Sequence, residues 1–218
     1  MSNQILEFSI NVYNNFSSSD EEQKQSITNI SSLLSEKVMT FQEVLVEMGP
    51  YLTSHDEKIR GRVTLLLAEI TKTLSLSHPI QISANSIYHI TIFFVKRMED
   101  FPSLLPSLKG IEVCIAYHTS RMESKESYIK DIFKSLSEVN CQNLSQSYRS
   151  QIYKIYLTLL ENSIARECLG GHEEVKDGGQ EMLSHSAVGK SSTDTENISL
   201  QFIEAVLTAT GEKFFIFF

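Results

Sequence analysis

The sequence predicts an all-α protein, an α-solenoid built as a right-handed stack of antiparallel helix pairs of the HEAT or armadillo kind. Apolar residues recur at three- and four-residue spacing along residues 1–167, and this is the period of one helix face. Short polar turns separate these apolar stripes. The helix pairs are expected to begin near residues 5, 40, 85 and 126, a period of about 40 residues that is typical of such repeats.

The first helix pair is expected between residues 5 and 34. Ser19 followed by Glu22 predicts a capping box, in which a hydroxyl and a carboxylate satisfy free amides at a helix start. Glu21-Glu22 is interpreted as the negative first turn that the helix dipole favours, and not as a catalytic carboxylate pair. The stripes expected in the core are Ile5, Phe8, Val12 and Phe16, and then Ile27, Ile30, Leu33 and Leu34.

The second helix pair has the clearest pattern. Thr40 and Glu43 predict another capping box, and Asp56 is expected to cap the helix that follows. Gly49-Pro50 is expected to kink or shorten the last turn of the first helix, because proline has no amide hydrogen. The stripes are Phe41, Val44, Leu45, Met48 and Leu52, and then Ile59, Val63, Leu66, Leu67, Ile70 and Leu74.

Two more pairs follow Pro79. Asn85 or Ser86 is expected to cap a fifth helix, although residues 90–95, ITIFFV, also fit a buried strand. We prefer the helix because no second strand pattern is present to pair with it. Pro106 is expected in the first turn of a sixth helix, where proline is tolerated. The remaining stripes are Ile87, Ile90, Phe94 and Arg97, then Leu104, Leu105, Leu108, Ile111 and Ile115, then Tyr128, Ile132, Phe133 and Leu136, and finally Leu144, Tyr148, Ile152, Ile155 and Leu159, with Ile164 as an optional last member.

The character of the sequence changes after residue 167. Residues 168–197 contain five glycines, scattered charges and almost no large apolar residues, which predicts a disordered or loosely ordered loop. Residues 198–218 predict a short helix and an apolar tail, interpreted as a truncated repeat. The expected organisation is therefore helical repeats over residues 1–167, a loop, and this short final segment.

Composition excludes several classes of protein. A net charge of -8 argues against a domain that grips nucleic acid through its phosphates. Three widely spaced cysteines predict neither a disulfide framework nor a cysteine-built metal site, and they fit a reducing compartment. The amino terminus does not read as a signal peptide, and no apolar run has the length that spans a bilayer. The expected location is the cytoplasm and nucleus.

No catalytic, cofactor-binding or metal-binding residue is predicted. The sequence has no nucleophile elbow, phosphate-binding loop or zinc-protease motif. Cys168 and His172 with Glu173-Glu174 are the only conceivable ligand group, but one cysteine and one histidine in a glycine-rich loop do not close a metal site. The chain is therefore expected not to be an enzyme and to hold no cofactor.

Four further histidines are interpreted as structural. His55, His78 and His118 fall in turns or at helix ends, where a solvated side chain is expected. His89 lies within an apolar helix pattern and is expected to be packed and hydrogen-bonded.

Arg60 and Arg62 leave two interpretations open. In the first, each arginine contacts a partner protein or the next repeat. In the second, each forms an ion pair with a neighbouring acidic residue such as Glu57 or Asp56. We favour the local ion pair, because exposed arginines usually have acidic residues nearby.

Residues 45–70, LVEMGPYLTSHDEKIRGRVTLLLAEI, resemble the amino-terminal segment of the methyl-methanesulfonate-sensitivity-nineteen family of long HEAT-repeat proteins. Residues 93–110 are similar to a second family pattern, and weaker similarity extends the resemblance over most of residues 25–165. This chain departs from the family at Arg60-Gly61-Arg62-Val63, where members usually read Arg-x-Arg-Gly, and it is several times shorter, so an amino-terminal fragment is expected. The matching positions are Met48-Gly49, Tyr51-Leu52-Thr53, Asp56, Ile59-Arg60, Arg62, Leu65-Leu66-Leu67, Arg97, Asp100, Leu108 and Gly110, with weaker matches at Gln146, Arg149, Tyr153 and Gly211-Glu212-Lys213.

The resemblance implies a non-catalytic scaffold of the cytosolic iron-sulfur protein assembly targeting complex. Family members bring clusters to apo-proteins of DNA repair, replication and transcription. The implied partners are the other targeting subunits and apo-proteins such as DNA helicases and polymerases, with no direct nucleic-acid or membrane contact. The alternatives are a generic HEAT or armadillo adaptor, an enzyme with a convergent polar pocket, and a nucleic-acid binder with a basic face.

Overall fold

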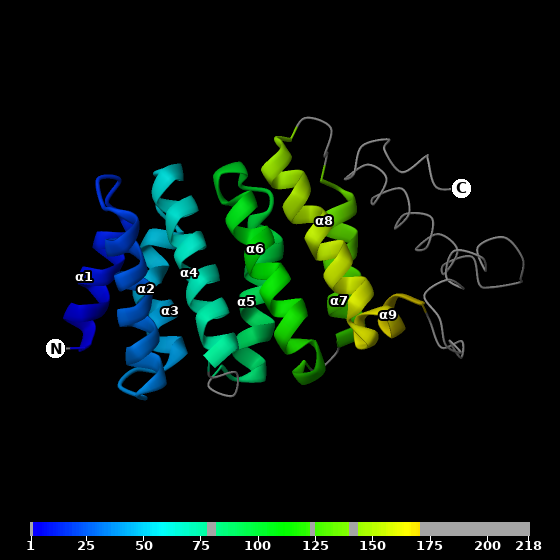
Figure 1. Cartoon of the computed structure of the whole chain (residues 1–218), viewed down its shortest axis with the longest axis horizontal. Helices are drawn as coiled ribbons and strands as arrows, with labels where there is room; N and C mark the ends of the chain where they lie inside the picture. Colours follow the sequence, from blue (N-terminus) through cyan, green and yellow to red (C-terminus); the bar gives the residue numbers. More distant parts are fainter. Residues whose placement is uncertain (1, 78–81, 123–124, 140–143, 171–218) are drawn as a thin grey trace, which may run out of the picture. The chain divides into compact units, whose positions relative to one another are not determined.

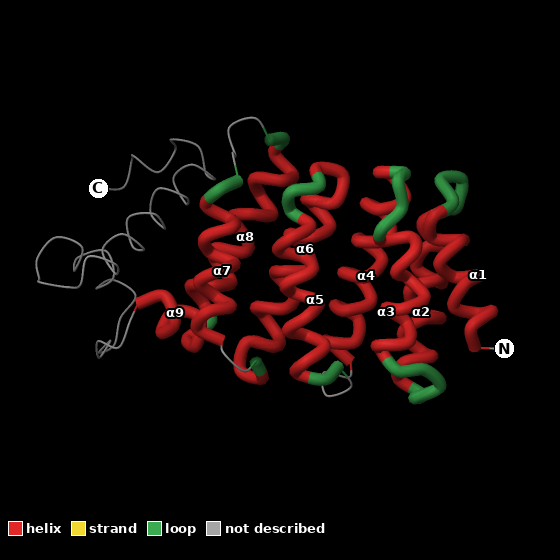
Figure 2. Tube along the Cα trace, turned by 180° about the vertical axis from the view of Figure 1, so that it is seen from behind, coloured by secondary structure: helices red, strands yellow, loops and turns green. Residues whose placement is uncertain are grey.

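The computed structural model describes residues 2–77, 82–122, 125–139 and 144–170. Within these ranges all the regular secondary structure is helical (Figures 1 and 2), which confirms the all-α prediction. The chain divides into two compact units, Met1–Met122 and Glu123–Phe218. Pairs begin at Ser2, Phe41, Ala84 and Lys125, so the predicted repeat of about 40 residues is also confirmed.

The described residues of the first unit, 2–77 and 82–122, form three helix pairs. Helices α2, α4 and α6 lie side by side in one layer, with α3 and α5 behind them (Figure 1). The most extensive packing joins α4 to α6, and each of the two helices in a pair also packs against the other. The helices are α1 (Ser2–Asn14), α2 (Asp20–Ser35), α3 (Phe41–Leu52), α4 (Glu57–Ser77), α5 (Ala84–Arg97) and α6 (Phe101–His118), followed by the short 3-10 helix η2 (Thr119–Arg121).

Local capping determines where several helices begin. The Glu22 carboxylate accepts from the Ser19 amide at 2.7 Å, and the Glu43 carboxylate accepts from the Thr40 amide at the same distance. Both predicted capping boxes are present. The Asp56 carboxylate accepts from an amide in the first turn of α4 at 2.8 Å, as predicted. These starts depend on residues three apart, so sequence alone was sufficient to find them.

Helix α5 begins earlier than predicted. Its cap is Ser83, whose hydroxyl accepts from the Ser86 amide at 3.0 Å, and the predicted caps Asn85 and Ser86 lie inside the first turn. Residues 90–95 are helical, so the choice of helix over strand is confirmed.

The predicted core stripe of α1 is wrong. Phe8 is 65% exposed and Ile5 is 41% exposed, whereas Leu6 and Ile10 are buried in the core together with Tyr13. Both stripes have helical spacing, and only the position of the neighbouring helices decides which stripe is covered. Helix α1 also ends at Asn14, so Phe16, the last member of the predicted stripe, follows the helix and is 61% exposed.

Helix α6 starts at Phe101, which corrects the predicted position of Pro106. Pro102 occupies the first turn, and Pro106 lies further inside the helix. Because Pro106 has no amide hydrogen, the Pro102 carbonyl cannot receive the usual helical bond. The backbone of Gly61 in α4 lies against this carbonyl, since a Cβ at position 61 would be 2.6 Å from its oxygen. Gly61 therefore permits the close approach of α4 to α6.

Gly110 has the same role between α5 and α6. A Cβ at this position would lie 2.3 Å from the Phe94 ring, which is itself fully buried. The two helices pack this closely only because residue 110 has no side chain. Gly49, in contrast, has no atom near its Cβ position beyond its chain neighbours and its own helix backbone.

The second unit contains α7 (Lys125–Ser137), α8 (Gln146–Glu161) and α9 (Ser163–Gly170). The Phe133 and Tyr156 rings meet edge to face with their centroids 6.0 Å apart. The single helix predicted to extend to Ile164 is interrupted, because α8 ends at Glu161 and the Asn162 side chain accepts from the Ala165 amide at 3.1 Å to start α9. Leu144 precedes α8.

The predicted loop boundary at residue 168 falls inside α9, which continues to Gly170. The rest of the predicted loop and the whole of residues 198–218 lie outside the described residues, as do Pro79 and residues Gly211-Glu212-Lys213. The division of the chain after residue 167 therefore stays a prediction, and so does the handedness of the stack.

Replacing Gly110 with alanine is expected to lower the free energy of unfolding by about 1–3 kcal/mol, because the new Cβ overlaps the Phe94 ring. The matched control is Gly49→Ala, where nothing is displaced and the change should stay within about 0.5 kcal/mol, since the gain in helix propensity opposes the restriction imposed by the following proline. Urea denaturation followed by circular dichroism measures both values. Equal effects of the two substitutions would contradict the packing described between α5 and α6.

Candidate functional site

Two arginines on α4 connect the helix pairs of the first unit. Arg60 and Arg62 lie two residues apart on the helix, so their side chains leave it in nearly opposite directions. Arg60 reaches toward α6 and Arg62 reaches toward α1. We call this pair and its partners the arginine clasp. Both residues belong to the stretch that resembles the methyl-methanesulfonate-sensitivity-nineteen family.

Arg60 joins the second helix pair to the third. Its Nε and Nη2 atoms donate to the two carboxylate oxygens of Asp100 at 3.1 and 2.9 Å. Its Nη1 atom donates to the carbonyls of Ser54 and His55 at 2.9 and 3.0 Å, which anchors the turn between α3 and α4. Such a two-pronged arginine–carboxylate contact fixes orientation as well as distance. The turn of one pair is thereby tied to the start of α6 in the next.

Asp100 gathers three donors. Besides Arg60, it accepts from the Ser103 hydroxyl at 2.7 Å, and the Arg97 guanidinium lies 3.6 Å from it. The hydrogen bond from Arg60, helped by the bond from Ser103, holds the pKa of the Asp100 carboxyl below its usual value. Asp100 therefore stays ionised at neutral pH. Arg97 also donates to the Leu52 carbonyl at 2.7 Å, which adds a second link between these pairs.

Arg62 joins the second helix pair to the first. Its Nε atom donates to the Tyr13 carbonyl at 3.0 Å, and Nη2 donates to the same oxygen and, at 3.4 Å, to the Asn15 carbonyl. The Tyr13 carbonyl lies in the last turn of α1, where the helix has no partner for it and carries a partial negative charge. The Asn15 carbonyl follows the helix and also accepts from the Ser18 amide at 3.1 Å. The guanidinium also lies 4.8 Å from the centre of the Phe16 ring.

The favoured interpretation of these arginines is wrong. Arg60 pairs with Asp100, forty residues away, and not with Glu57 or Asp56. Asp56 is occupied with the cap of α4. The other interpretation, contact with the neighbouring repeat, describes both arginines. Arg60 lies in one stretch of family resemblance and Asp100 in the other, and this is the sequence signal that connects the two residues.

His118 corrects the prediction for the histidines. It is fully buried, with Nε2 2.7 Å from the Ser75 hydroxyl and Nδ1 3.3 Å from Nη1 of Arg121. An arginine only donates, so Nδ1 accepts and the proton is assigned to Nε2, which donates to Ser75. Ser75 in turn donates to the Thr71 carbonyl at 2.6 Å. Burial, and to a lesser extent Arg121, lower the pKa of His118 to about 4.

The other histidines divide between confirmation and correction. His55 is exposed as predicted, whereas His89, predicted to be packed, is exposed on α5. His118 is buried although it ends α6, because α6 packs against α4 and the imidazole bonds to Ser75 there. His78 lies outside the described residues.

The two cysteines among the described residues, Cys114 and Cys168, form no disulfide with each other. Cys114 is fully buried, which raises the pKa of its thiol to about 12, and burial also raises the pKa of Cys168. Both are free thiols. Across the described ranges no group of three or more histidine, cysteine and acidic side chains is arranged to hold a metal ion. His172 and Glu173-Glu174 from the weighed ligand group lie outside those ranges.

None of the helices described here is both long enough and apolar enough to cross a membrane.

Stacked antiparallel helix pairs, joined through buried packing and interlocking arginines, define a helical-repeat protein. A family model for the MMS19 amino-terminal region, described as Dos2-interacting transcription regulator of RNA-Pol-II, matches residues 45–185. The match covers more than half of the chain, and the chain belongs to this family. The expectation drawn from residues 45–70 and 93–110 is thus confirmed at the level of the family.

Two curated relatives carry the name MMS19 nucleotide excision repair protein homolog. The relative from Dictyostelium discoideum is 27% identical over 136 residues, which is 62% of this chain and 11% of the relative. The relative from Arabidopsis thaliana is 27% identical over 152 residues, which is 69% of this chain and 12% of the relative. The chain therefore spans only about a tenth of the length of these relatives. No solved structure matches it significantly.

Replacing Asp100 with alanine is expected to lower the free energy of unfolding by about 1–2 kcal/mol, because Arg60, Arg97 and Ser103 lose a shared acceptor that is largely shielded from water. Glu21→Ala is the control, since its ion pair with Lys24 is exposed and should contribute less than about 0.5 kcal/mol. Urea denaturation at neutral pH measures both. A loss no larger than that of the control would contradict a structural role for the clasp.

His118 is expected to make stability depend on pH. Its pKa is about 4 in the folded chain and about 6.5 when unfolded, so below pH 6.5 the unfolded chain takes up a proton that the folded chain does not. Stability is full above pH 6.5 and falls by up to about 3 kcal/mol as the pH drops from 6.5 to 4. His118→Gln keeps a donor for Ser75 but does not titrate. The urea concentration at the midpoint of unfolding, measured at pH 7.5, 6 and 5, should fall less steeply with pH for this variant than for the wild-type chain. Parallel pH dependences would refute the role assigned to His118.

Proposed function

We propose that the chain is a non-catalytic scaffold of the cytosolic iron-sulfur protein assembly targeting complex, working in the cytoplasm and nucleus. The observation that carries the proposal is the location of the residues that this chain has in common with the family pattern. Arg60, Arg97 and Asp100 act between helix pairs, and Gly110 lets α5 and α6 pack closely within one pair. What this chain has in common with the family is therefore the stack itself.

A stack of helix pairs supports this kind of work physically. Each pair contacts only its neighbours, so the repeats present an extended surface that binds a partner through many modest contacts. The iron-sulfur cluster is cargo in this proposal, carried by other subunits. The buried, protonated thiol of Cys114 fits a chain that does not bind the cluster itself. The partners are the other targeting subunits and apo-proteins such as DNA helicases and polymerases.

The names of the relatives support a connection with DNA repair. Both relatives are called nucleotide excision repair protein homologs. The net charge of -8 favours an indirect role, in which the chain contacts the proteins that work on DNA and not the DNA. This chain spans only 11% and 12% of those relatives, so its contact with the targeting subunits and client proteins is part of the proposal.

An affinity pull-down tests the proposal. The tagged chain is expressed beside a tagged full-length relative in the same cells, and the eluates are scored for the iron-sulfur targeting subunits and for client DNA helicases. We expect the short chain to retain clients, with or without the other subunits. If it retains neither, although circular dichroism shows a folded helical protein, the scaffold proposal fails for this chain and a general helical-repeat adaptor becomes the better description.

A further inference from the structure

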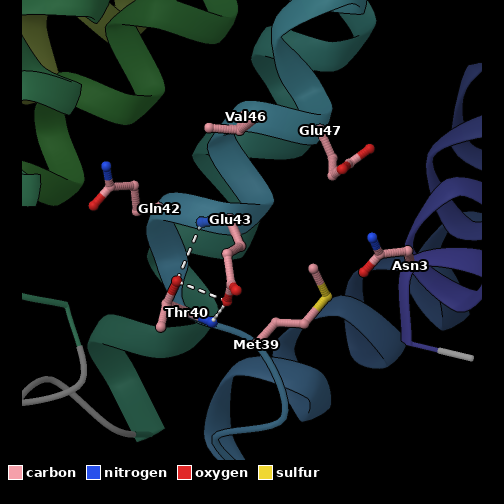
Figure 3. Close-up of a pocket in the computed structure, with 7 residues that line it drawn as sticks. All are labelled: Asn3, Met39, Thr40, Gln42, Glu43, Val46 and Glu47. Carbon is pink, nitrogen blue, oxygen red and sulfur yellow. Dashed lines mark hydrogen bonds between the residues drawn. The ribbon is translucent and has the colours of Figure 1, made fainter.

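A surface groove of about 320 Å³ lies between the amino-terminal end of α1 and the first turns of α3 (Figure 3). Its volume is at the lower end of the range for ligand pockets, roughly 300–1,000 Å³, so it accommodates one or two side chains and not a domain. The residues that line it are Asn3, Met39, Thr40, Gln42, Glu43, Val46 and Glu47.

The groove offers apolar contact as well as charge. Met39 is 7% exposed and its side chain lies between α1 and α3, whereas Val46 on α3 is 66% exposed (Figure 3). An aliphatic side chain as exposed as Val46 gains from being covered, because burying its surface removes apolar area from water. The groove therefore favours an occupant with an apolar component.

Two carboxylates stand on the same side of α3. Glu43 and Glu47 are four residues apart, which places them one turn from each other. One oxygen of Glu43 is held by the Thr40 amide and hydroxyl at 2.7 and 2.9 Å. These bonds keep the pKa of Glu43 below its usual value, so the carboxylate is charged at neutral pH. The charged residues that line the groove are both acidic.

Three polar side chains of the groove are uncommitted. Within the described ranges, the side chains of Asn3, Gln42 and Glu47 form no hydrogen bond or ion pair. The amides can donate and accept, as a peptide backbone requires, and the Glu47 carboxylate can accept from a cation. The capping box in contrast holds the Glu43 carboxylate in one position, whereas the Glu47 carboxylate can move to meet a cation.

We propose that this groove binds a short segment of a partner protein in which a lysine or arginine adjoins an apolar side chain. The apolar side chain and the stem of the basic residue cover Val46 and Met39, and the cation lies between Glu43 and Glu47. Gln42 and Asn3 bond to the backbone of the segment. The inference deepens the proposed scaffold function, on which it rests, by naming the chemistry of one contact.

The probe is a fluorescein-labelled peptide, GKLRLKG, titrated with the full chain and followed by fluorescence anisotropy. A small site should bind it with a dissociation constant of roughly 100 μM. Amide shifts in NMR spectra should change at Asn3 and residues 39–47. A peptide with glutamate at each basic position should not bind. No binding of GKLRLKG up to 1 mM, or shift changes confined to other helices, would overturn the inference.

Matched variants separate the groove from general attraction to an acidic chain. Glu43→Gln with Glu47→Gln removes two charges, and glutamine still serves in a capping box. We expect this variant to bind about five- to tenfold more weakly. Glu21→Gln with Glu57→Gln removes the same charge from exposed positions on α2 and α4 and should change binding less than twofold. Equal weakening by both pairs would mean nonspecific electrostatics and would refute the site.

A third variant tests the apolar contact. Val46→Asn keeps the charge and should weaken binding about threefold; unchanged affinity would contradict a contact with Val46.

The groove proposal and the scaffold proposal can be refuted independently of each other. Clients retained by Glu43→Gln with Glu47→Gln, together with no peptide binding to the wild-type chain, would refute the groove alone. Peptide binding without any retained client would refute the scaffold proposal alone.

Discussion

The two-pronged contact between Arg60 and Asp100 is the interaction on which the first unit depends. A helix pair cannot bury both of its apolar faces alone, so stacking is required, but apolar stripes by themselves leave the register between pairs loosely defined. Arg60 removes that freedom because it binds the turn of its own pair and the start of α6 at once. Gly61 is the next residue, and its lack of a side chain lets α4 and α6 approach at the same point. Arg62 then attaches the first pair from the opposite side of α4.

The features that could be predicted from the sequence are those decided within a few residues. The capping boxes at Ser19 and Thr40, the cap at Asp56 and the helical spacing of the core stripes all depend on short-range patterns, and the structure has them. The all-α class and the repeat of about 40 residues follow from the same information. The boundaries that were missed, at Ser83 and Asn162, concern which of several nearby polar residues makes the cap.

The features that could not be predicted depend on packing between segments distant in sequence. Helix α1 has two stripes of equal helical quality, and only its neighbours decide that Leu6 and Ile10 are covered while Phe8 is not. His118 ends a helix, which usually means exposure, but here it bonds to Ser75 of α4. The partner of Arg60 is Asp100, forty residues away, and not an acidic residue close to it in sequence. The clasp forms only because the fold brings the two stretches of family resemblance together.

Native-state hydrogen exchange tests most directly whether the arginine clasp makes neighbouring pairs one cooperative unit. If it does, the slowest amides of α4 and of α6 exchange with the same opening free energy in the intact chain. Replacing Arg60 with methionine should separate them, because α6 then opens without α4. Equal opening free energies in both proteins would mean that apolar packing alone couples the pairs. Unequal values already in the intact chain would contradict the account, since the pairs would then be independent with the clasp in place.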